Sequence, residues 1–226
     1  MKFTEYLNEV EISSSKIQPK NRKDLEELVK KTIKEQGPNC DLNFIDTSKM
    51  KIMSGIFADS VFNGDISEWD VSNVEDMEFM FCNSKFNGDI SKWDVSKVKN
   101  MNWMFQKSQF NGDISDWNVS KVERMASMFE KSKFNGDISK WNVAKVYETT
   151  SMFMDSLFNR DISKWNLRSL EYAANMFKNS KFNQDISDWK LPKMNVEYHY
   201  GVFDGCPLED NPKYQPTYFK SSVHYA

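Results

Sequence analysis

Histidine and cysteine are scarce in this chain, and their scarcity restricts the chemistry that it can perform. Only two histidines occur in 226 residues, His199 and His224, so a site built on histidine acid–base or metal chemistry is nearly excluded. The three cysteines, Cys40, Cys82 and Cys206, form no CxxC pair. Because no export signal is visible, they indicate reduced thiols rather than a disulfide framework or a zinc site.

Long apolar runs and a large excess of one charge are also missing. No apolar stretch is long enough to span a bilayer, and residues 1–16 lack the apolar core of a secretory signal. The formal net charge is −3, from 30 basic and 33 acidic side chains, which leaves no footprint for nucleic acid or an anionic membrane. We expect a cytoplasmic protein that binds neither nucleic acid nor membrane directly, and we take it to be a monomer.

The chain is dominated by an internal repeat of 24 residues. Residues 38–61 fit the same frame as the later copies, which makes about seven coils. A fixed period of this length is typical of one small unit stacked on copies of itself. Coil positions are numbered from a leading phenylalanine, position 1, which opens the phrase FNGDIS in most copies. This phenylalanine recurs without a gap as Phe62, Phe86, Phe110, Phe134, Phe158 and Phe182.

Each coil carries two hydrophobic rhythms. Positions 8 and 10, such as Trp93 and Val95, alternate with polar residues as in a strand with one buried face. Positions 13, 16, 19 and 20, such as Val98, Met101 and Met104, follow the spacing of a short helix face, and the serine at position 11 is a natural N-cap. The sequence therefore predicts an α/β solenoid of leucine-rich-repeat type, in which about seven strand–helix coils form a parallel sheet.

The two ends of the chain depart from the repeat and are expected to cap it. Residues 22–36 place Leu25, Val29 and Ile33 on one stripe before Gly37, which predicts a helix that covers the first coil. The aromatic residues after position 193 lose the period. We divide the chain into an N-terminal segment with the capping helix (1–37), the repeat (38–193) and an irregular C-terminal cap with its tail (194–226).

The repeated phrases FNGDISxWDVSxV and MxxMF resemble the BspA-like repeats of bacterial surface proteins, which are grouped with leucine-rich repeats. The resemblance covers residues 38–193. It implies a scaffold for protein recognition, often at cell surfaces, but it does not itself imply an activity. We expect no enzymatic activity and no cofactor. The chain departs from the surface members of that family because it shows neither an export signal nor a wall or lipid anchor.

Two polar columns recur in every coil and are first interpreted as scaffold. Position 2 is asparagine and position 4 is aspartate, from Asn39 and Asp41 to Asn183 and Asp185. Stacked amides can satisfy a turn, and each carboxylate should accept backbone N–H groups in an Asx-type turn, because carboxylates one coil apart repel each other. The alternatives are a ligand site on the asparagines and a row of calcium sites on the aspartates. We assign no catalytic, cofactor-binding or metal-binding residue.

Candidate partner-binding residues lie where the repeat varies. Position 18 carries Phe79 and Trp103 in adjacent coils, a candidate hot spot unless the rings pack against the neighbouring helix. The outward strand positions 7 and 9 drift from acidic to neutral or basic along the stack, and they either match the charges of a partner or form a merely solvated face. The candidates at these two positions are Glu68, Asp70, Lys92, Asp94, Asp116 and Asn118.

Position 12 carries a row of lysines that is interrupted by Asn73 and Ser169. Alone, this row would suggest an edge for contact with acidic groups. Because acidic residues surround it, we interpret the row as a solvated rim. Its members are Lys49, Lys97, Lys121, Lys145 and Lys193.

The sequence favours a non-enzymatic module that binds a protein partner through the surface of the repeat. One form of this hypothesis is a phage- or mobile-element-encoded inhibitor of a host defence effector, since a small acidic protein could block a basic nucleic-acid channel. The alternative is a structural or adhesin-type component of a virion or cell surface. An enzyme that uses paired aspartates on glycans is the least favoured hypothesis, because every coil would carry the same pair.

Overall fold

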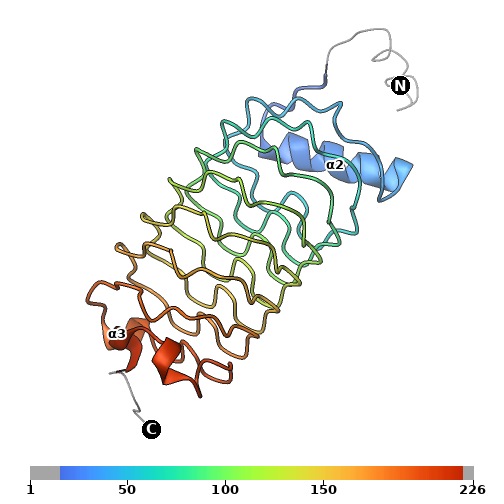
Figure 1. The fold of residues 1–226 in the computed structure, drawn as a ribbon. Coiled ribbons are helices and arrows are strands. Elements are labelled where there is room, and N and C mark those ends of the chain that lie inside the picture. Colours follow the sequence, from blue (N-terminus) through green and yellow to red (C-terminus); the bar gives the residue numbers. More distant parts are fainter. Residues whose placement is uncertain (1–15, 221–226) are drawn as a thin grey trace.

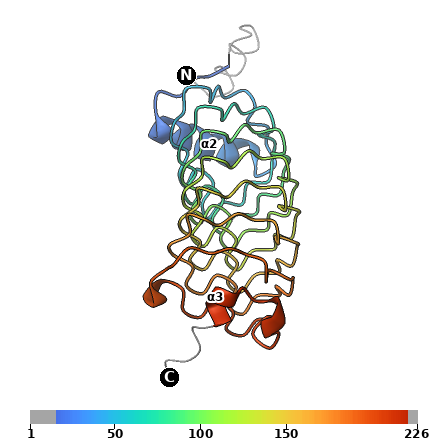
Figure 2. The same cartoon turned by 60° about the vertical axis from the view of Figure 1, so that its left-hand side comes forward.

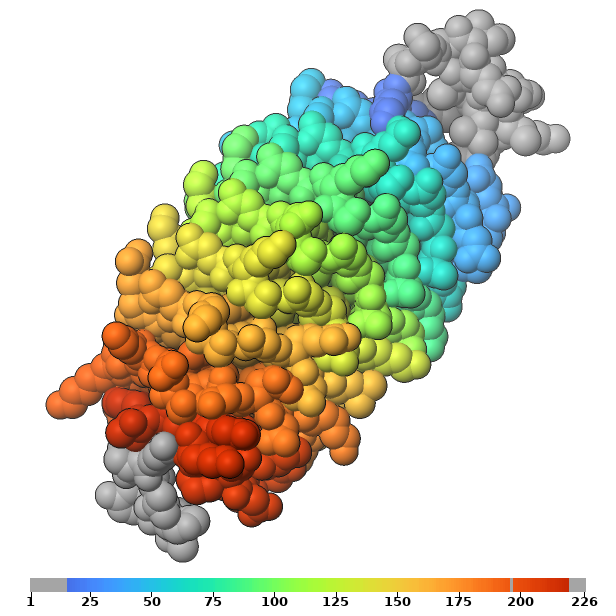
Figure 3. Space-filling view, in the orientation of Figure 1, coloured from blue at the N-terminus to red at the C-terminus, as the bar shows by residue number. Residues whose placement is uncertain are grey.

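In the computed structural model, which describes residues 16–220, the chain winds through successive coils that stack along one axis (Figure 1). Helix α2 (Arg22–Gln36) lies at the N-terminal end of the stack, and the short helices η1 (Val196–Tyr198), η2 (Pro212–Tyr214) and α3 (Thr217–Lys220) lie at the C-terminal end, as Figure 2 shows from a second side. The colour bands in Figure 3 cross the body in sequence order, so each coil packs on the coils before and after it. Residues 1–15 of the expected N-terminal segment and residues 221–226 of the expected tail lie outside the described range.

The coils are built from linked turns, and the predicted strand–helix solenoid with a parallel sheet is wrong. In residues 16–220 the β pairing consists of isolated parallel bridges, most of which join position 15 of successive coils, as in Asp76↔Asn100 and Asn100↔Arg124. The helices of this range lie at its two ends and none lies within the regular coils. Successive coils are therefore joined by backbone hydrogen bonds between turns rather than by a ladder of strands.

Left-handed backbone at two positions of every coil prevents a helix from forming there. Positions 18 and 22 have positive φ throughout, for example 57° at Phe79 and 51° at Asn83. A right-handed helix requires negative φ at each residue, so these positions interrupt it. Instead, three overlapping turns close through hydrogen bonds from the N–H groups of positions 19, 21 and 23 to the carbonyls of positions 16, 18 and 20, as from Met80 to Met77 at 3.1 Å.

A directional set of hydrogen bonds joins this turn segment to the next coil. The N–H groups of positions 16, 18, 20 and 22 donate to carbonyls of positions 15, 17, 19 and 21 in the following coil, as from Phe105 to Met128 at 2.9 Å. At the N-terminal end, where no earlier coil supplies donors, the Arg22 Nε group donates to the Ser54 carbonyl at 2.5 Å. The turns therefore satisfy their backbone without forming a sheet.

Aromatic and methionine side chains fill the interior, as the sequence predicted. Phe105 is fully buried and stacks on Phe81 and Phe129 of the neighbouring coils, at ring-centroid distances of 5.5 and 5.7 Å. Each tryptophan at position 8 is buried and donates its indole N–H to a carbonyl of the preceding coil, as Trp117 does to Ile90 at 3.1 Å. The indole groups thus add a polar bond to a core that is otherwise held by apolar burial.

Helix α2 has the range that its apolar stripe predicts, 22–36. The Asn21 side chain accepts two backbone N–H groups of the first turn at 2.9 and 3.1 Å, and Gly37 ends the helix with φ of 93°. Leu25 and Val29 are fully buried and belong to the same core as the coils. The helix therefore covers apolar surface at this end of the stack. No helix in residues 16–220 has the length and apolar character needed to cross a bilayer.

Residues 198–206 repeat the turn segment once more, beyond the point at which the sequence period fades. Gly201 and Gly205 have φ of 62° and 66° and take the places of positions 18 and 22. The Ala173 N–H donates to the Tyr198 carbonyl at 2.7 Å, two residues later than the regular period of 24 would place the acceptor. An insertion of two residues therefore hides this last turn segment from a search at constant period.

Candidate interaction surfaces

The aspartates of position 4 are turn residues, as predicted. A carboxylate oxygen accepts the N–H group of the residue two positions later, which is serine in most coils, as Asp113 does from Ser115 at 2.9 Å. In residues 16–220 no group of three or more His, Cys, Asp or Glu side chains is placed to hold a metal ion. The backbone hydrogen bond, with a second from the serine hydroxyl, lowers the pKa of the carboxyls of Asp65, Asp89, Asp113, Asp137 and Asp161.

The asparagines of position 2 join one coil to the next. From the second coil onward, the side-chain oxygen of each asparagine accepts the backbone N–H of the asparagine in the following coil, as Asn111 does from Asn135 at 2.8 Å. The same bond recurs between Asn63 and Asn87 at 2.7 Å. These bonds satisfy the backbone N–H group of position 2 in the turn that opens each coil, so the asparagine column has a structural role.

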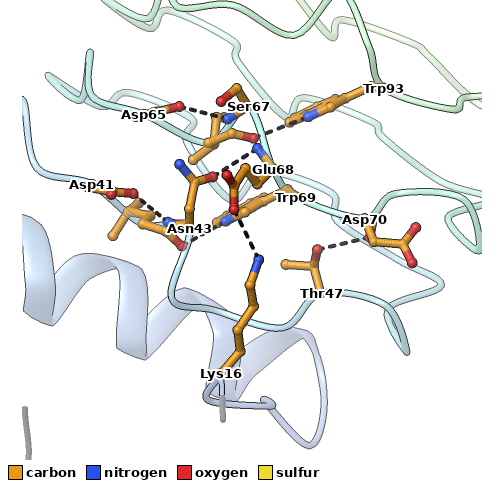
Figure 4. A network of polar contacts seen from close by, with 12 residues as sticks. Lys16, Asp41, Asn43, Thr47, Asp65, Ser67, Glu68, Trp69, Asp70 and Trp93 are labelled. Carbon is orange, nitrogen blue, oxygen red and sulfur yellow. Dashed lines mark hydrogen bonds and ion pairs between the residues drawn. The ribbon is translucent and has the colours of Figure 1, made fainter. Parts of the chain in front are cut away.

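Glu68 and Asp70 lie on the surface of the first coils, within the network shown in Figure 4. The Glu68 carboxylate pairs with Lys16 at 3.5 Å, and the Glu68 backbone N–H donates to the Asn43 side chain at 2.9 Å. The Asp70 carbonyl accepts the Thr47 hydroxyl at 2.9 Å. Both candidates thus help to join the first coils while their carboxylates stay exposed.

The remaining candidates of positions 7 and 9 are also exposed, but they form no convergent site. Asp94 and Asn118 each accept the backbone N–H two residues later, at 3.0 and 3.2 Å, so position 9 is a second turn position. The hydroxyl and backbone N–H of Ser96 lower the pKa of the Asp94 carboxyl. Lys92 and Asp116, at position 7, lie exposed between the turns. The structure therefore places these four residues on an exposed surface without gathering them around a shared ligand position.

Phe79 and Trp103 come together on the surface, in the turn segments of adjacent coils. Their ring centroids lie 4.7 Å apart, and the ring planes are within 7° of each other. Phe79 is 38% exposed and Trp103 is partly buried. Because the regular coils contain no helix, the alternative in which these rings pack against a neighbouring coil's helix does not apply. We call this stacked pair the aromatic ledge.

The aromatic ledge occupies backbone that disfavours aromatic residues. Phe79 and Trp103 have φ of 57° and 56°. Side chains with a Cβ atom in this left-handed region carry a penalty of roughly 1–2 kcal/mol, and bulky residues are rare there. Glycine and asparagine tolerate it better. The equivalent residues of the other coils are all small or amide side chains: Gly55, Ser127, Ser151, Asn175 and Gly201.

A shallow groove that the sequence analysis did not predict crosses the C-terminal coils beside positions 11–14. It has a volume of about 570 Å³. Two lysines of the position-12 row line the groove. In the coil between them, where Ser169 interrupts the row, Arg168 at position 11 supplies the cation instead, and a comparison of position 12 alone does not find it. The charged and aromatic residues that line the groove are Glu123, Lys145, Tyr147, Arg168, Glu171 and Lys193.

Comparison with known proteins identifies a family whose function is not known. The family model described as "Mycoplasma protein of unknown function, DUF285" matches residues 23–133 and, a second time, residues 108–212. No curated protein and no solved structure matches the chain. The two matches together extend from within α2 to the start of η2, which is most of the sequence. The chain therefore belongs to the family of Mycoplasma proteins of unknown function, DUF285.

Proposed function

We propose that the chain is a non-enzymatic scaffold that binds a protein partner through the aromatic ledge of Phe79 and Trp103. The observation that carries this proposal is the pair of stacked, partly exposed rings at backbone positions where the other coils have Gly, Ser or Asn. Residues held in a sparsely populated conformation cluster at functional sites. Aromatic side chains are also enriched among the residues that dominate interface affinity. Two such residues in adjacent coils therefore favour recognition over a role in folding.

The charges beside the aromatic ledge suggest the chemistry of the partner. Asp76 and Glu78 precede Phe79 in the same coil and are partly exposed. The Asp76 carboxylate accepts the backbone N–H of Glu78 at 2.9 Å and an amide hydrogen of Asn100 at 3.2 Å, so its position is fixed. An apolar side chain flanked by lysine or arginine would fit both the rings and these carboxylates.

The resemblance to BspA-like repeats supports the same general role, since that family implies a scaffold for protein recognition. The family match is consistent with this resemblance. The inhibitor form of the hypothesis, the structural or adhesin-type alternative, the cytoplasmic location and the monomeric state stay predictions.

The test replaces the ledge with the residue that two other coils carry at the same position. Phe79→Ser/Trp103→Ser should keep the fold, because Ser127 and Ser151 occupy equivalent backbone. We expect affinity capture from a lysate of the source cells to retain a partner on the unchanged chain. The ledge variant should lose that partner, with an affinity reduced by roughly thirty-fold for a hot spot of this kind.

A matched control removes exposed apolar surface elsewhere. Val61 and Leu157 are 61% and 50% exposed, so Val61→Ser/Leu157→Ser should leave capture unchanged. The proposal is wrong if the ledge variant retains every partner of the unchanged chain, or if the unchanged chain retains no protein above background.

A further inference from the structure

Three cationic side chains line the groove across the C-terminal coils. Lys145 and Lys193 stand at position 12, and Arg168 stands at position 11 of the coil between them. In that coil the Ser169 hydroxyl turns toward the scaffold and donates to the Ala144 carbonyl at 2.8 Å. All three cations are exposed, and within residues 16–220 their charged groups have no hydrogen-bond or ion-pair partner. Because coils joined by backbone hydrogen bonds lie about 4.8 Å apart, the three charges form a short row.

Two of the equivalent cations in an earlier coil are engaged by neighbouring side chains. Lys97, at position 12, donates to the Asn73 side chain at 2.6 Å. Lys99, at position 14, pairs with Glu75 at 2.7 Å. Within the groove, by contrast, three cations in successive coils have no such partner.

Position 14 supplies a second row, made of Glu123, Tyr147 and Glu171. The backbone of this row is fixed, because the Tyr147 N–H donates to the Glu123 carbonyl at 3.0 Å and the Glu171 N–H donates to the Tyr147 carbonyl at 2.8 Å. The Tyr147 ring packs edge-on against Tyr172, with ring centroids 6.4 Å apart. The groove therefore offers a row of cations and, beside it, two carboxylates and a phenol on a rigid support.

We propose that this groove binds an extended acidic segment of a polypeptide, at a site separate from the aromatic ledge. Aspartate or glutamate side chains of the segment pair with Lys145, Arg168 and Lys193, of which the guanidinium can hold a carboxylate through two parallel hydrogen bonds. The carboxylates of Glu123 and Glu171 accept N–H groups from the backbone of the same segment. A polypeptide has both kinds of group, so it matches both rows.

The two carboxylates of the groove discriminate against a uniformly anionic polymer. A nucleic acid carries phosphates along its whole length, and its binding relies on contacts between those phosphates and cations. Glu123 and Glu171 would repel the phosphates that lie beside them. The arrangement thus favours a polypeptide over a nucleic acid.

The test measures fluorescence anisotropy of three labelled probes of equal length at physiological salt: an alternating Glu–Ala peptide, an alternating Lys–Ala peptide and oligothymidylate. We expect saturable binding of the Glu–Ala peptide alone. Lys145→Glu/Arg168→Glu/Lys193→Glu should weaken that binding by about tenfold or more, from the loss of three exposed ion pairs. The proposal is overturned if the Glu–Ala peptide does not bind saturably, or if it binds no more tightly than oligothymidylate.

Two further variants separate the groove from bulk charge and from the ledge. Lys49→Glu/Lys92→Glu/Lys97→Glu changes the net charge equally on other coils and should alter peptide binding less than about twofold. An equal loss in both triple variants contradicts the proposal, because it would reflect net charge. Phe79→Ser/Trp103→Ser should leave peptide binding unchanged, so failure of one proposal is distinguishable from failure of the other.

The two carboxylates of the second row, Glu123 and Glu171, allow a test whose result net charge alone does not predict. Replacing both carboxylates, Glu123→Gln/Glu171→Gln, keeps hydrogen-bond acceptors and removes the repulsion. We expect the affinity for oligothymidylate to rise relative to that for the Glu–Ala peptide. An unchanged ratio of the two affinities would show that these carboxylates do not select the ligand, and it would contradict the proposal.

Discussion

At the scale of single residues, Lys107 shows how the conformation of a coil acts on one side chain. It lies exposed at position 22 with φ of 56°, the left-handed region. Its N–H donates to the Glu130 carbonyl at 2.8 Å, which fixes the backbone in place. In the last turn segment the equivalent residue is Gly205, with φ of 66°. Glycine avoids the contact between Cβ and the carbonyl oxygen that disfavours other residues there.

We therefore expect Lys107→Gly to raise the free energy of unfolding by about 0.5–1 kcal/mol, because relief of the local strain outweighs the added freedom of the unfolded chain. Urea unfolding followed by circular dichroism measures the change. Lys121→Gly is the control, since Lys121 is exposed and has ordinary φ, and it should lower the free energy of unfolding by a similar amount. A change of the same sign in both variants would contradict this account of position 22.

The aspartate column could be predicted at this scale because its bonds are local. Asp113 accepts an N–H group only two residues away, so the spacing of aspartate and serine in the sequence is enough to predict the turn. The pairing of Phe79 with Trp103 was also accessible, since residues one period apart must be neighbours in a stack. The groove was not, because Arg168 supplies its charge from position 11 and the sequence does not show which lysines lack partners.

At the scale of elements, α2 could be predicted and the turns of the coils could not. The helix has a continuous apolar stripe, an asparagine N-cap and a terminal glycine, three independent signals that agree. In the coils, positions 13, 16 and 19 are buried at intervals of three because successive turns bring every third residue inward. Hydrophobic periodicity reports which side chains are buried and does not report φ, so turns and a short helix give the same pattern.

A signal for the turns was nevertheless present in the residue types of positions 18 and 22. Glycine, asparagine and aspartate tolerate left-handed backbone better than other residues. Phe79 and Trp103 obscured this preference at position 18, and the two-residue insertion displaced the last pair of glycines from the period. The residues that carry the signal are Gly55, Asp59, Asn83, Asp155, Asn175, Asn179, Gly201 and Gly205.

The C-terminal cap contains a buried histidine that should make it sensitive to pH. His199 is only 4% exposed, and neither ring nitrogen has a hydrogen-bond partner within residues 16–220. Its ring contacts Tyr218 and Phe219 of α3, at centroid distances of 5.1 and 5.8 Å. Burial in these surroundings lowers the pKa of the imidazole below its ordinary value of 6.5.

The sign of the pH effect follows from proton binding. Near pH 6.5 the unfolded chain binds more protons at His199 than the folded chain does, so stability falls as pH decreases through about 6.5. The slope from one group is at most about 1.4 kcal/mol per pH unit. His199→Met, which places there the residue of equivalent Met101, should raise stability and remove this slope in urea unfolding. His224→Gln should retain the slope, and a slope that survives in His199→Met would contradict the assignment.

At the scale of the whole molecule, the aspartate column makes the stack sensitive to acid. The carboxyls of Asp89, Asp113 and Asp137, at position 4, have pKa values below the ordinary 3.8, because each accepts a backbone N–H and a hydroxyl of the same turn. Their contribution to stability is fully present above pH 3.8 and is lost as pH falls through the lower, folded-state values. Each coil packs mainly on its neighbours, so loss of these turns in several coils should lower the stability of the whole stack.

Asp113→Asn, in a middle coil, separates the charge of the column from its geometry. Asn118 shows that an amide oxygen can accept the same kind of N–H group, from Ser120 at 3.2 Å, so the variant should keep the turn. We expect little change in the free energy of unfolding at pH 7 and a shallower loss of stability between pH 4 and pH 2, because one titrating group is removed. Asp113→Ala removes the acceptor and should lower stability at pH 7 by about 1 kcal/mol. If Asp113→Asn and the unchanged chain lose stability equally in acid, the sensitivity must arise outside this column, and the stack would owe its acid response to other carboxylates.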